Sequence, residues 1–182
     1  MESSFKDLEN NAAEASTKKS IIDYGLITSI ASIFITLIGY AMGNAANPGL
    51  VLGIIGFVVP ITLIVLGIKN FKKRNNGFLK WAQAVKVGIG ITIIWGLIAL
   101  TFQYVLENYI DPNILEQKAE LLRTQLENWG MDEDQIEESI EKQKNGNPLL
   151  GNALGLLFFA FIGFVVSAIA GAIMQKREED TF

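Results

Sequence analysis

From Leu50 to Ile68 the sequence reads LVLGIIGFVVPITLIVLGI, an unbroken apolar stretch without a charged residue. An α-helix rises about 1.5 Å per residue, so about 20 residues are needed to cross the roughly 30 Å hydrocarbon core of a bilayer. The stretch has that length, and it lacks the polar face, repeating every 3.6 residues, that a soluble helix presents to water. It therefore predicts a transmembrane helix.

Three further stretches meet the same criterion, at residues 21–42, 87–106 and 149–174, and their only charge is Asp23, close to one end. The predicted fold class is all-α: a polytopic integral membrane protein with four transmembrane helices in one bundle, forming a single domain over residues 21–175. Residues 1–20 are expected to be a polar N-terminal tail and residues 176–182 a cytoplasmic tail. The acidic residues of the first twenty, and the length of the apolar stretch behind them, argue against a cleaved signal peptide.

The segments between the spans alternate in charge. Two lysines precede the first span, the first loop has no charge, and the loop at residues 69–86 has six basic residues and no acid. Residues 107–148 hold eleven acidic and four basic residues, a net charge of −7, and Lys176 and Arg177 follow the last span. Because Lys and Arg concentrate in cytoplasmic loops, we expect both termini to be cytoplasmic and the acidic loop to lie on the other side.

Small and hydroxyl residues gather on one face of each predicted span. In membranes such faces let helix backbones approach closely, which predicts helix packing at these positions. The alternative is a weakly polar path for a solute, for which the spans offer no ionisable residue at depth. The Gly-x-x-x-Gly spacings 39–43 and 49–53 are also compatible with a homo-oligomer. The predicted packing residues are Gly25, Ser32, Thr36, Gly39, Gly43, Gly49, Gly53, Gly56, Gly88, Gly96, Gly155 and Gly163.

The basic loop combines cations with aromatic side chains, which is typical of a membrane interface. The residues concerned are Lys69, Lys72, Lys73, Arg74, Lys80, Trp81 and Lys86. Two interpretations stay open: an anchor that only sets topology, or a specific site for anionic lipid or for a partner.

The acidic segment predicts a helical insert at residues 111–145. Asp111 followed by Pro112 is a helix start, and Gly130 can end that helix in the left-handed conformation. Asp132 with Gln135 starts a second helix. The apolar seam of the first helix runs through Leu115, Ala119, Leu122, Leu126 and Trp129. It needs a cover: the second arm, the top of the bundle, a second copy or a protein partner. Leu115, Leu122, Leu126 and Trp129 are the candidate partner surface.

Chemistry is restricted by composition, because the chain has no histidine and no cysteine. This removes imidazole bases, thiol nucleophiles and nearly every structural zinc site. No carboxylate pair lies within a span, and no phosphate-binding or dinucleotide motif is present. The acidic cluster of the insert lacks the glycine and the ligand alternation of a calcium loop. With a net charge of −4, nucleic-acid binding is not expected. We expect no enzyme activity, no cofactor and no metal site.

Four stretches resemble a known family: KSIIDYGL from Lys19, GIKNFKKRNNGF from Gly67, WAQAVKVG from Trp81 and NYIDP from Asn108. They are similar to domain-of-unknown-function family 4199, four-span proteins found mainly in Bacteroidetes, and the likeness extends from Lys19 to about Gln175. The resemblance implies a bacterial inner-membrane protein whose acidic hairpin is periplasmic. It implies no activity, and it supplies no catalytic or ligand-binding residue.

Three hypotheses for function follow. The first is a non-enzymatic structural, accessory or regulatory component of a larger membrane assembly. The second is a small-solute transporter or channel component that acts as an oligomer, with Thr28, Ser32, Thr36, Thr92 and Gln103 along its path. The third is handling of anionic lipid or envelope stress through the basic loop.

Overall fold

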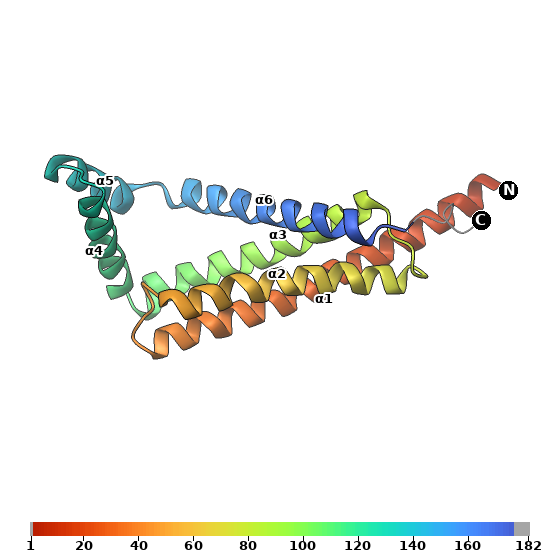
Figure 1. The fold of residues 1–182 in the computed structure, drawn as a ribbon, viewed down its shortest axis with the longest axis horizontal. Helices are drawn as coiled ribbons and strands as arrows, with labels where there is room; N and C mark the ends of the chain where they lie inside the picture. The colour runs from red at the N-terminus through yellow and green to blue at the C-terminus, as the bar shows by residue number, and fades with distance from the viewer. Residues whose placement is uncertain (1, 177–182) are drawn as a thin grey trace.

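The computed structural model describes residues 2–176 and is helical along nearly all of that length (Figure 1). This confirms the predicted all-α class. In chain order the elements are α1 (Glu2–Ala41), α2 (Gly49–Arg74), α3 (Trp81–Val105), the short π-helix η1 (Leu106–Ile110), α4 (Asn113–Asn128), α5 (Glu133–Asn145) and α6 (Pro148–Met174).

Four of the helices are long and apolar enough to cross a membrane. These spans are Thr17–Ala41, Gly49–Arg74, Trp81–Ile110 and Leu150–Met174. At the basic end of the bundle, the first three spans are longer than predicted. The charged residues there continue the helices, whereas the apolar pattern alone would end them. In particular, α1 continues through residue 20 without a break. The predicted tail at residues 176–182 lies, apart from Lys176, outside the described residues.

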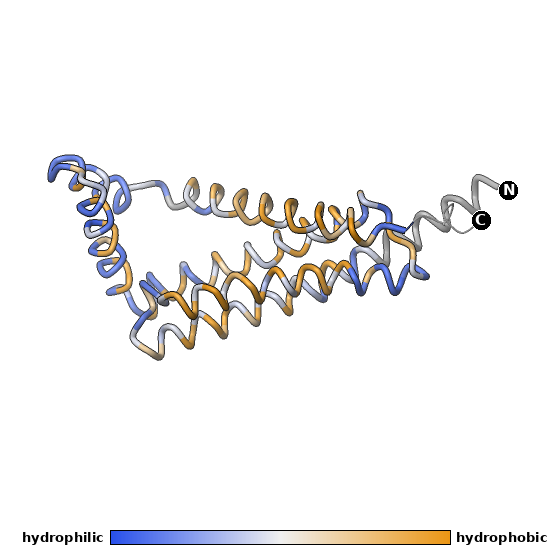
Figure 2. The backbone as a smooth tube through the Cα atoms, viewed as in Figure 1, coloured by the Kyte–Doolittle hydropathy of each residue, from blue (hydrophilic) through white to orange (hydrophobic). Residues whose placement is uncertain are grey.

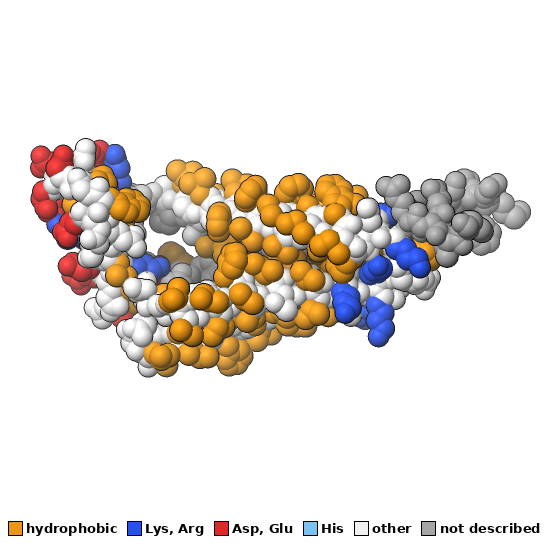
Figure 3. All heavy atoms as spheres, in the orientation of Figure 1, with side chains coloured by type: hydrophobic (Ala, Val, Ile, Leu, Met, Phe, Trp, Pro, Cys, Tyr) orange, Lys and Arg blue, Asp and Glu red, His pale blue; other side chains and the backbone are white. Residues whose placement is uncertain are grey.

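The distribution of side chains is that of a membrane protein. Large apolar side chains such as Phe34, Leu50 and Phe161 are more than half exposed on the outer surface of the spans. Figures 2 and 3 show hydrophobic residues along the whole length of the bundle, and Figure 3 shows lysine and arginine gathered at one end and a mostly acidic surface, with some basic side chains, at the other. Such a continuous apolar surface is unfavourable in water and favourable in lipid.

Helix α3 is the centre of the bundle, since it packs against both α1 and α6, while α1 also packs against α2. Close contacts occur where a glycine faces a partner helix. Gly25 of α1 lies against Ile94, and Gly96 of α3 lies against Leu156 and Phe159. Gly88 and Gly163 form the tightest pair of contacts, against Ser167 and Thr92 respectively. An added Cβ at Gly25, Gly88 or Gly163 would collide with the neighbouring helix, and at Gly96 it would make a tight contact.

Other predicted packing residues lie elsewhere. Gly43 and Gly49 have φ of +73° and +71° at the turn between α1 and α2, and no atom lies within 4 Å of an added Cβ. They depart from the packing prediction because they serve the turn, where a left-handed backbone favours glycine. An added Cβ at Gly53 would likewise meet no atom within 4 Å. At Gly39, Gly56 and Gly155 an added Cβ would lie 3.4–3.9 Å from its nearest neighbours, which is ordinary van der Waals contact.

The two ends of the bundle differ. At the basic end, the α2–α3 loop is joined to the end of α6 by two backbone hydrogen bonds between Leu79 and Lys176, of 2.9 and 3.0 Å. At the opposite end, α4 runs across the direction of the spans, and α5 leads back to α6 (Figure 1). Among the described helices, α4 and α5 pack on each other, and α4 packs in addition only on η1.

The glycine contact between α3 and α6 gives a stability test. We predict that Gly163→Ala destabilises the protein by about 1–3 kcal/mol through overpacking, because the β-branched Thr92 cannot rotate away from the new methyl group. The control is Gly151→Ala on the same helix, whose Cβ would meet nothing within 4 Å. Thermal unfolding in one detergent should show a lower midpoint for Gly163→Ala only. Equal midpoints for the two variants would contradict the packing assigned here.

Candidate functional site

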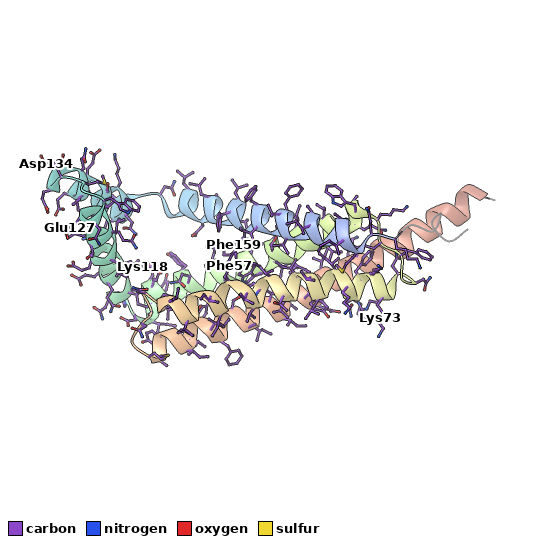
Figure 4. All side chains as sticks on the ribbon, in the orientation of Figure 1. Phe57, Lys73, Lys118, Glu127, Asp134 and Phe159 are labelled. Carbon is purple, nitrogen blue, oxygen red and sulfur yellow. The ribbon has the colours of Figure 1, made fainter. Side chains whose placement is uncertain are left out.

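A cavity of about 450 Å³ lies between the four spans, in the half of the bundle nearer to the acidic end. All four long helices contribute to its wall, and that wall is mostly apolar and rich in aromatic rings. Figure 4 shows Phe57 of α2 and Phe159 of α6 at the space between their helices. The lining consists of Ser32, Ile33, Ile35, Thr36, Gly53, Gly56, Phe57, Trp95, Ala99, Leu100, Phe102, Gln103, Phe158, Phe159 and Ile162.

The cavity exists because only the other half of the bundle is packed solid. The fully buried residues Ile64, Ile68 and Phe71 of α2 form one core with Val87 and Ile91 of α3. Towards the acidic end α6 separates from α1 and α2 (Figure 1), and this part of α2 faces the cavity with glycines. A bundle that is wedge-shaped in this way has room for a molecule between its helices.

Two polar atoms in the cavity wall lack a hydrogen-bond partner among the described residues: Trp95 Nε1 and Ser32 Oγ. Trp95 is only 9% exposed, and its ring meets that of Phe159 edge to face, with centroids 4.6 Å apart. Thr36, also in the wall, differs from Ser32 because its hydroxyl donates to the Ser32 carbonyl oxygen at 3.0 Å. Both atoms have less than 1 Å² of accessible surface, so they are buried within the helix contacts and are not open to the cavity.

A short polar relay leads from the cavity to the extramembrane helices. Gln103 Nε2, in the cavity wall, donates to Glu107 Oε1, and Lys118 Nζ of α4 donates to the same oxygen. Glu107 lies in η1, whose wider turns replace the last turns of α3, and π-helical turns are frequent at functional sites. The side chain of Glu107 is 13% exposed and that of Lys118 33% exposed. This partly buried ion pair holds α4 against the end of α3.

The hairpin of α4 and α5 has a small core of its own. Leu126 packs with Ile136 and Ile140, and Ala119 and Leu122 lie against them. Arg123 bridges both arms through ion pairs with Glu133 and Glu137 of α5. The two carboxylates hold the pKa of Arg123 above its ordinary value, and Lys142 lowers the pKa of Glu138 on the same arm. The hairpin is therefore a defined unit.

The predicted partner surface divides into two parts. The second arm covers Leu122 and Leu126, whereas Leu115 is 45% exposed and Trp129 is 76% exposed. By spacing Trp129 continues the seam of α4, but it follows the last residue of that helix, Asn128, beside the turn at Gly130 with φ +77°, and it stands exposed there. Asp132 begins α5 as predicted, with its Oδ1 accepting from the Gln135 backbone N–H at 3.0 Å.

The predicted basic cluster is partly engaged within the fold. Lys72 Nζ donates to the Met174 carbonyl oxygen at the end of α6 (2.6 Å), and Trp81 Nε1 donates to the Ala168 carbonyl oxygen (3.1 Å). Arg74 lies 3.7 Å from Asp23 of α1. Lys86 also has an interaction partner. The exposed residues Lys69, Lys73 and Lys80 remain directed to the surface.

Of the five residues predicted along a solute path, the structure brings together Ser32, Thr36 and Gln103 at the cavity. Thr28 and Thr92 are fully buried in helix contacts instead. Their hydroxyls donate to backbone carbonyl oxygens of their own helices, of Tyr24 and of Gly88 and Ile89.

Sequence reasoning missed the aromatic wall and the pair of Glu107 and Lys118. Phenylalanines in an apolar span carry no signal that distinguishes an inward from a lipid-facing ring. The spacing of eleven residues between Glu107 and Lys118 indicates no contact until the π-helical turns and the start of α4 bring them together. An acid at the end of a long apolar span, followed by the first base of the insert, is the signal that could have found the pair.

The cavity wall offers hydrogen-bonding groups, and none of the lining residues in the described part of the chain is titratable. Among the side chains that the structure describes, there is also no cluster of acidic residues arranged to hold a metal ion. The arrangement can bind an uncharged, largely apolar molecule.

Four membrane-length helices, an apolar outer surface and a charged end on each side define a polytopic α-helical membrane protein. The chain belongs to the family described as "Protein of unknown function (DUF4199)", which it matches over residues 23–176. The resemblance noted in the sequence is thereby confirmed. No curated protein and no solved structure matches the chain.

The relay gives a test of how the hairpin is held. We predict that Lys118→Met weakens the docking of α4 by about 1 kcal/mol, because it leaves the partly buried carboxylate of Glu107 without its cation. Amide hydrogen exchange over α4 should then accelerate roughly fivefold. The control is Lys142→Met, which removes the far more exposed pair with Glu138. If both variants exchange alike, the pair does not hold the hairpin.

Proposed function

We propose that this protein is a non-enzymatic accessory or regulatory component of a larger assembly in the bacterial inner membrane. The observation that carries the proposal is the hairpin of α4 and α5. Among the described helices it contacts the spans only through η1, its second arm covers Leu122 and Leu126, and Trp129 stands 76% exposed at its turn.

The form of the hairpin supports a role in contact with another protein. A connection between two antiparallel spans needs only a few residues, whereas this one forms two helices with a core and cross-arm ion pairs. An ordered arm of this kind loses little conformational entropy when it binds. Tryptophan is also enriched at the energetic centres of protein interfaces, because it buries a large area. Trp129 is therefore the proposed anchor, within an acidic surround.

The proposed orientation places the hairpin in the periplasm. Lysine and arginine gather at the end that holds the α2–α3 loop and Lys176, and the acidic residues gather on the hairpin (Figure 3). The positive-inside rule supports a cytoplasmic basic end.

Because the chain has no cysteine, single-cysteine labelling tests this orientation. We predict that Asp134→Cys reacts with a membrane-impermeant thiol reagent in cells whose outer membrane alone is permeable. Gln175→Cys, at the opposite end, should react only after the inner membrane is opened. The reverse pattern would overturn the proposed orientation.

The contact itself can be tested by a photo-activatable amino acid at position 129. We predict one defined adduct with a larger membrane protein in the native host, and at least a severalfold lower yield at position 125, where an exposed polar residue lies on the same helix. Adducts that are absent, or equal at both positions, would contradict the proposed anchor. A product of twice the chain mass would identify a homo-oligomer in place of a partner and overturn the accessory role.

A further inference from the structure

One exposed face of α2 changes from apolar to basic in the half of the helix nearer to the basic end. Its residues recur at spacings of four and three, which keeps them within an arc of about 80° at 100° per residue. This face is opposite the buried side of the helix, which carries Pro60, Ile64 and Phe71. We call it the α2 stripe, and its members, all exposed, are Val58, Thr62, Leu66, Lys69 and Lys73.

The two lysines of the α2 stripe lie at the depth of lipid headgroups. The 26 residues of α2 rise about 39 Å, which exceeds the hydrocarbon core by about 9 Å. Because α2 has no charged residue before Lys69, residues 69–74 account for this excess. Leu66 and Val58 then lie beside the acyl chains. The Thr62 hydroxyl between them donates to the Val58 carbonyl oxygen at 2.8 Å, so its hydrogen-bonding need is met within the helix.

Within the basic cluster, these two lysines are open to a ligand. Lys72 donates to a backbone carbonyl oxygen at the end of α6, and Arg74 lies 3.7 Å from Asp23, so both of these cations are engaged within the fold. No described acidic side chain forms an ion pair with Lys69 or Lys73. Figure 4 shows Lys73 pointing away from the bundle. The structure thus separates two free cations from the rest of the cluster.

Helix α1 adds positive charge at the same depth. Gly67 of α2 faces Tyr24 of α1, and the two helices run in opposite directions. The exposed residues Lys18 and Lys19 of α1 are therefore level with the basic end of α2. Asp23 is the only acidic residue among the described side chains at this end. The described side chains thus present a positive surface in the headgroup layer, which attracts anionic lipid.

We propose that the α2 stripe binds an anionic phospholipid. The phosphate lies between Lys69 and Lys73, which are one helical turn apart and can both reach it, and one acyl chain follows Leu66 and Val58 towards the midplane. A soluble anion or an acidic peptide would engage the lysines alone, whereas a phospholipid covers the stripe over its whole length. The stripe is at the opposite end of the bundle from the hairpin, so the proposal does not depend on the accessory role.

The headgroup contact can be tested by native mass spectrometry of the full chain in mild detergent. The probes are palmitoyl-oleoyl phosphatidylglycerol and the phosphatidylethanolamine with the same chains. We expect the anionic lipid to bind at least fivefold more tightly than the zwitterionic one. The double variant Lys69→Gln, Lys73→Gln should lower its affinity at least tenfold, because each lysine near an anionic lipid contributes about fivefold.

Two further double variants serve as controls. Lys142→Gln with Lys144→Gln removes the same charge from exposed positions on the hairpin, and it should bind the anionic lipid as the unaltered chain does. Lys69→Arg with Lys73→Arg keeps the charge at the stripe and should retain binding. An equal loss in the hairpin variant, or full binding by the glutamine variant of the stripe, would overturn the proposal.

A second measurement locates the acyl chain. Phosphatidylglycerol with a diazirine in one chain, photolysed with the full chain in nanodiscs, should label Val58 and Leu66 at least severalfold more than Ile30 and Phe34, which are exposed on α1. Equal labelling of the two helices, or displacement by glycerol phosphate as effectively as by the lipid, would overturn the contact with the chain. A protein that copurifies with the unaltered chain but not with the glutamine variant of Lys69 and Lys73, at unchanged lipid binding, would assign the lysines to that protein and overturn the proposal.

Discussion

Everything in this structure follows from the absence of water in the hydrocarbon core. Backbone N–H and C=O groups must be satisfied within each span, which leaves helices as the only spanning element for this chain. Lipid tails are as apolar as leucine, so burial of apolar surface does not hold helices together, and close packing must do so. The contacts of Gly88 and Gly163 between α3 and α6 supply this packing, and the other helices are arranged around them.

The same constraint explains why half of the bundle can be open. Where Gly67, Gly88 and Gly163 let the helices approach, the core around Ile64, Ile68 and Phe71 is solid. Towards the acidic end the second helix offers Gly53, which contacts nothing, and large rings on α6 stand opposite. The close contacts and the cavity therefore have one cause. The helices approach where a small residue faces a neighbouring helix, and they diverge where none does.

The fold could be predicted almost entirely from the sequence, because span length and charge position are properties of the chain itself. The candidate site could not. A stripe of small residues identifies a helix face but not its neighbour, so Gly43 and Gly49 look the same as Gly88 until the turn is known. Trp129 fits the apolar seam by spacing, and only the structure shows that it stands exposed where α4 ends. The missing hydrogen bonds of Ser32 and Trp95 are likewise visible only in the structure.

The cavity and the hairpin share one carboxylate. Gln103 in the cavity wall and Lys118 of α4 both donate to the same oxygen of Glu107. A shift of Gln103 along α3 must therefore carry Glu107 with it or break one of the two bonds, and breaking the bond to Lys118 releases the main polar contact between α4 and the spans. Glu107 lies in η1, whose wider turns replace the α-helical turns at this point. The cavity wall and the extramembrane hairpin are thus joined through a single carboxylate.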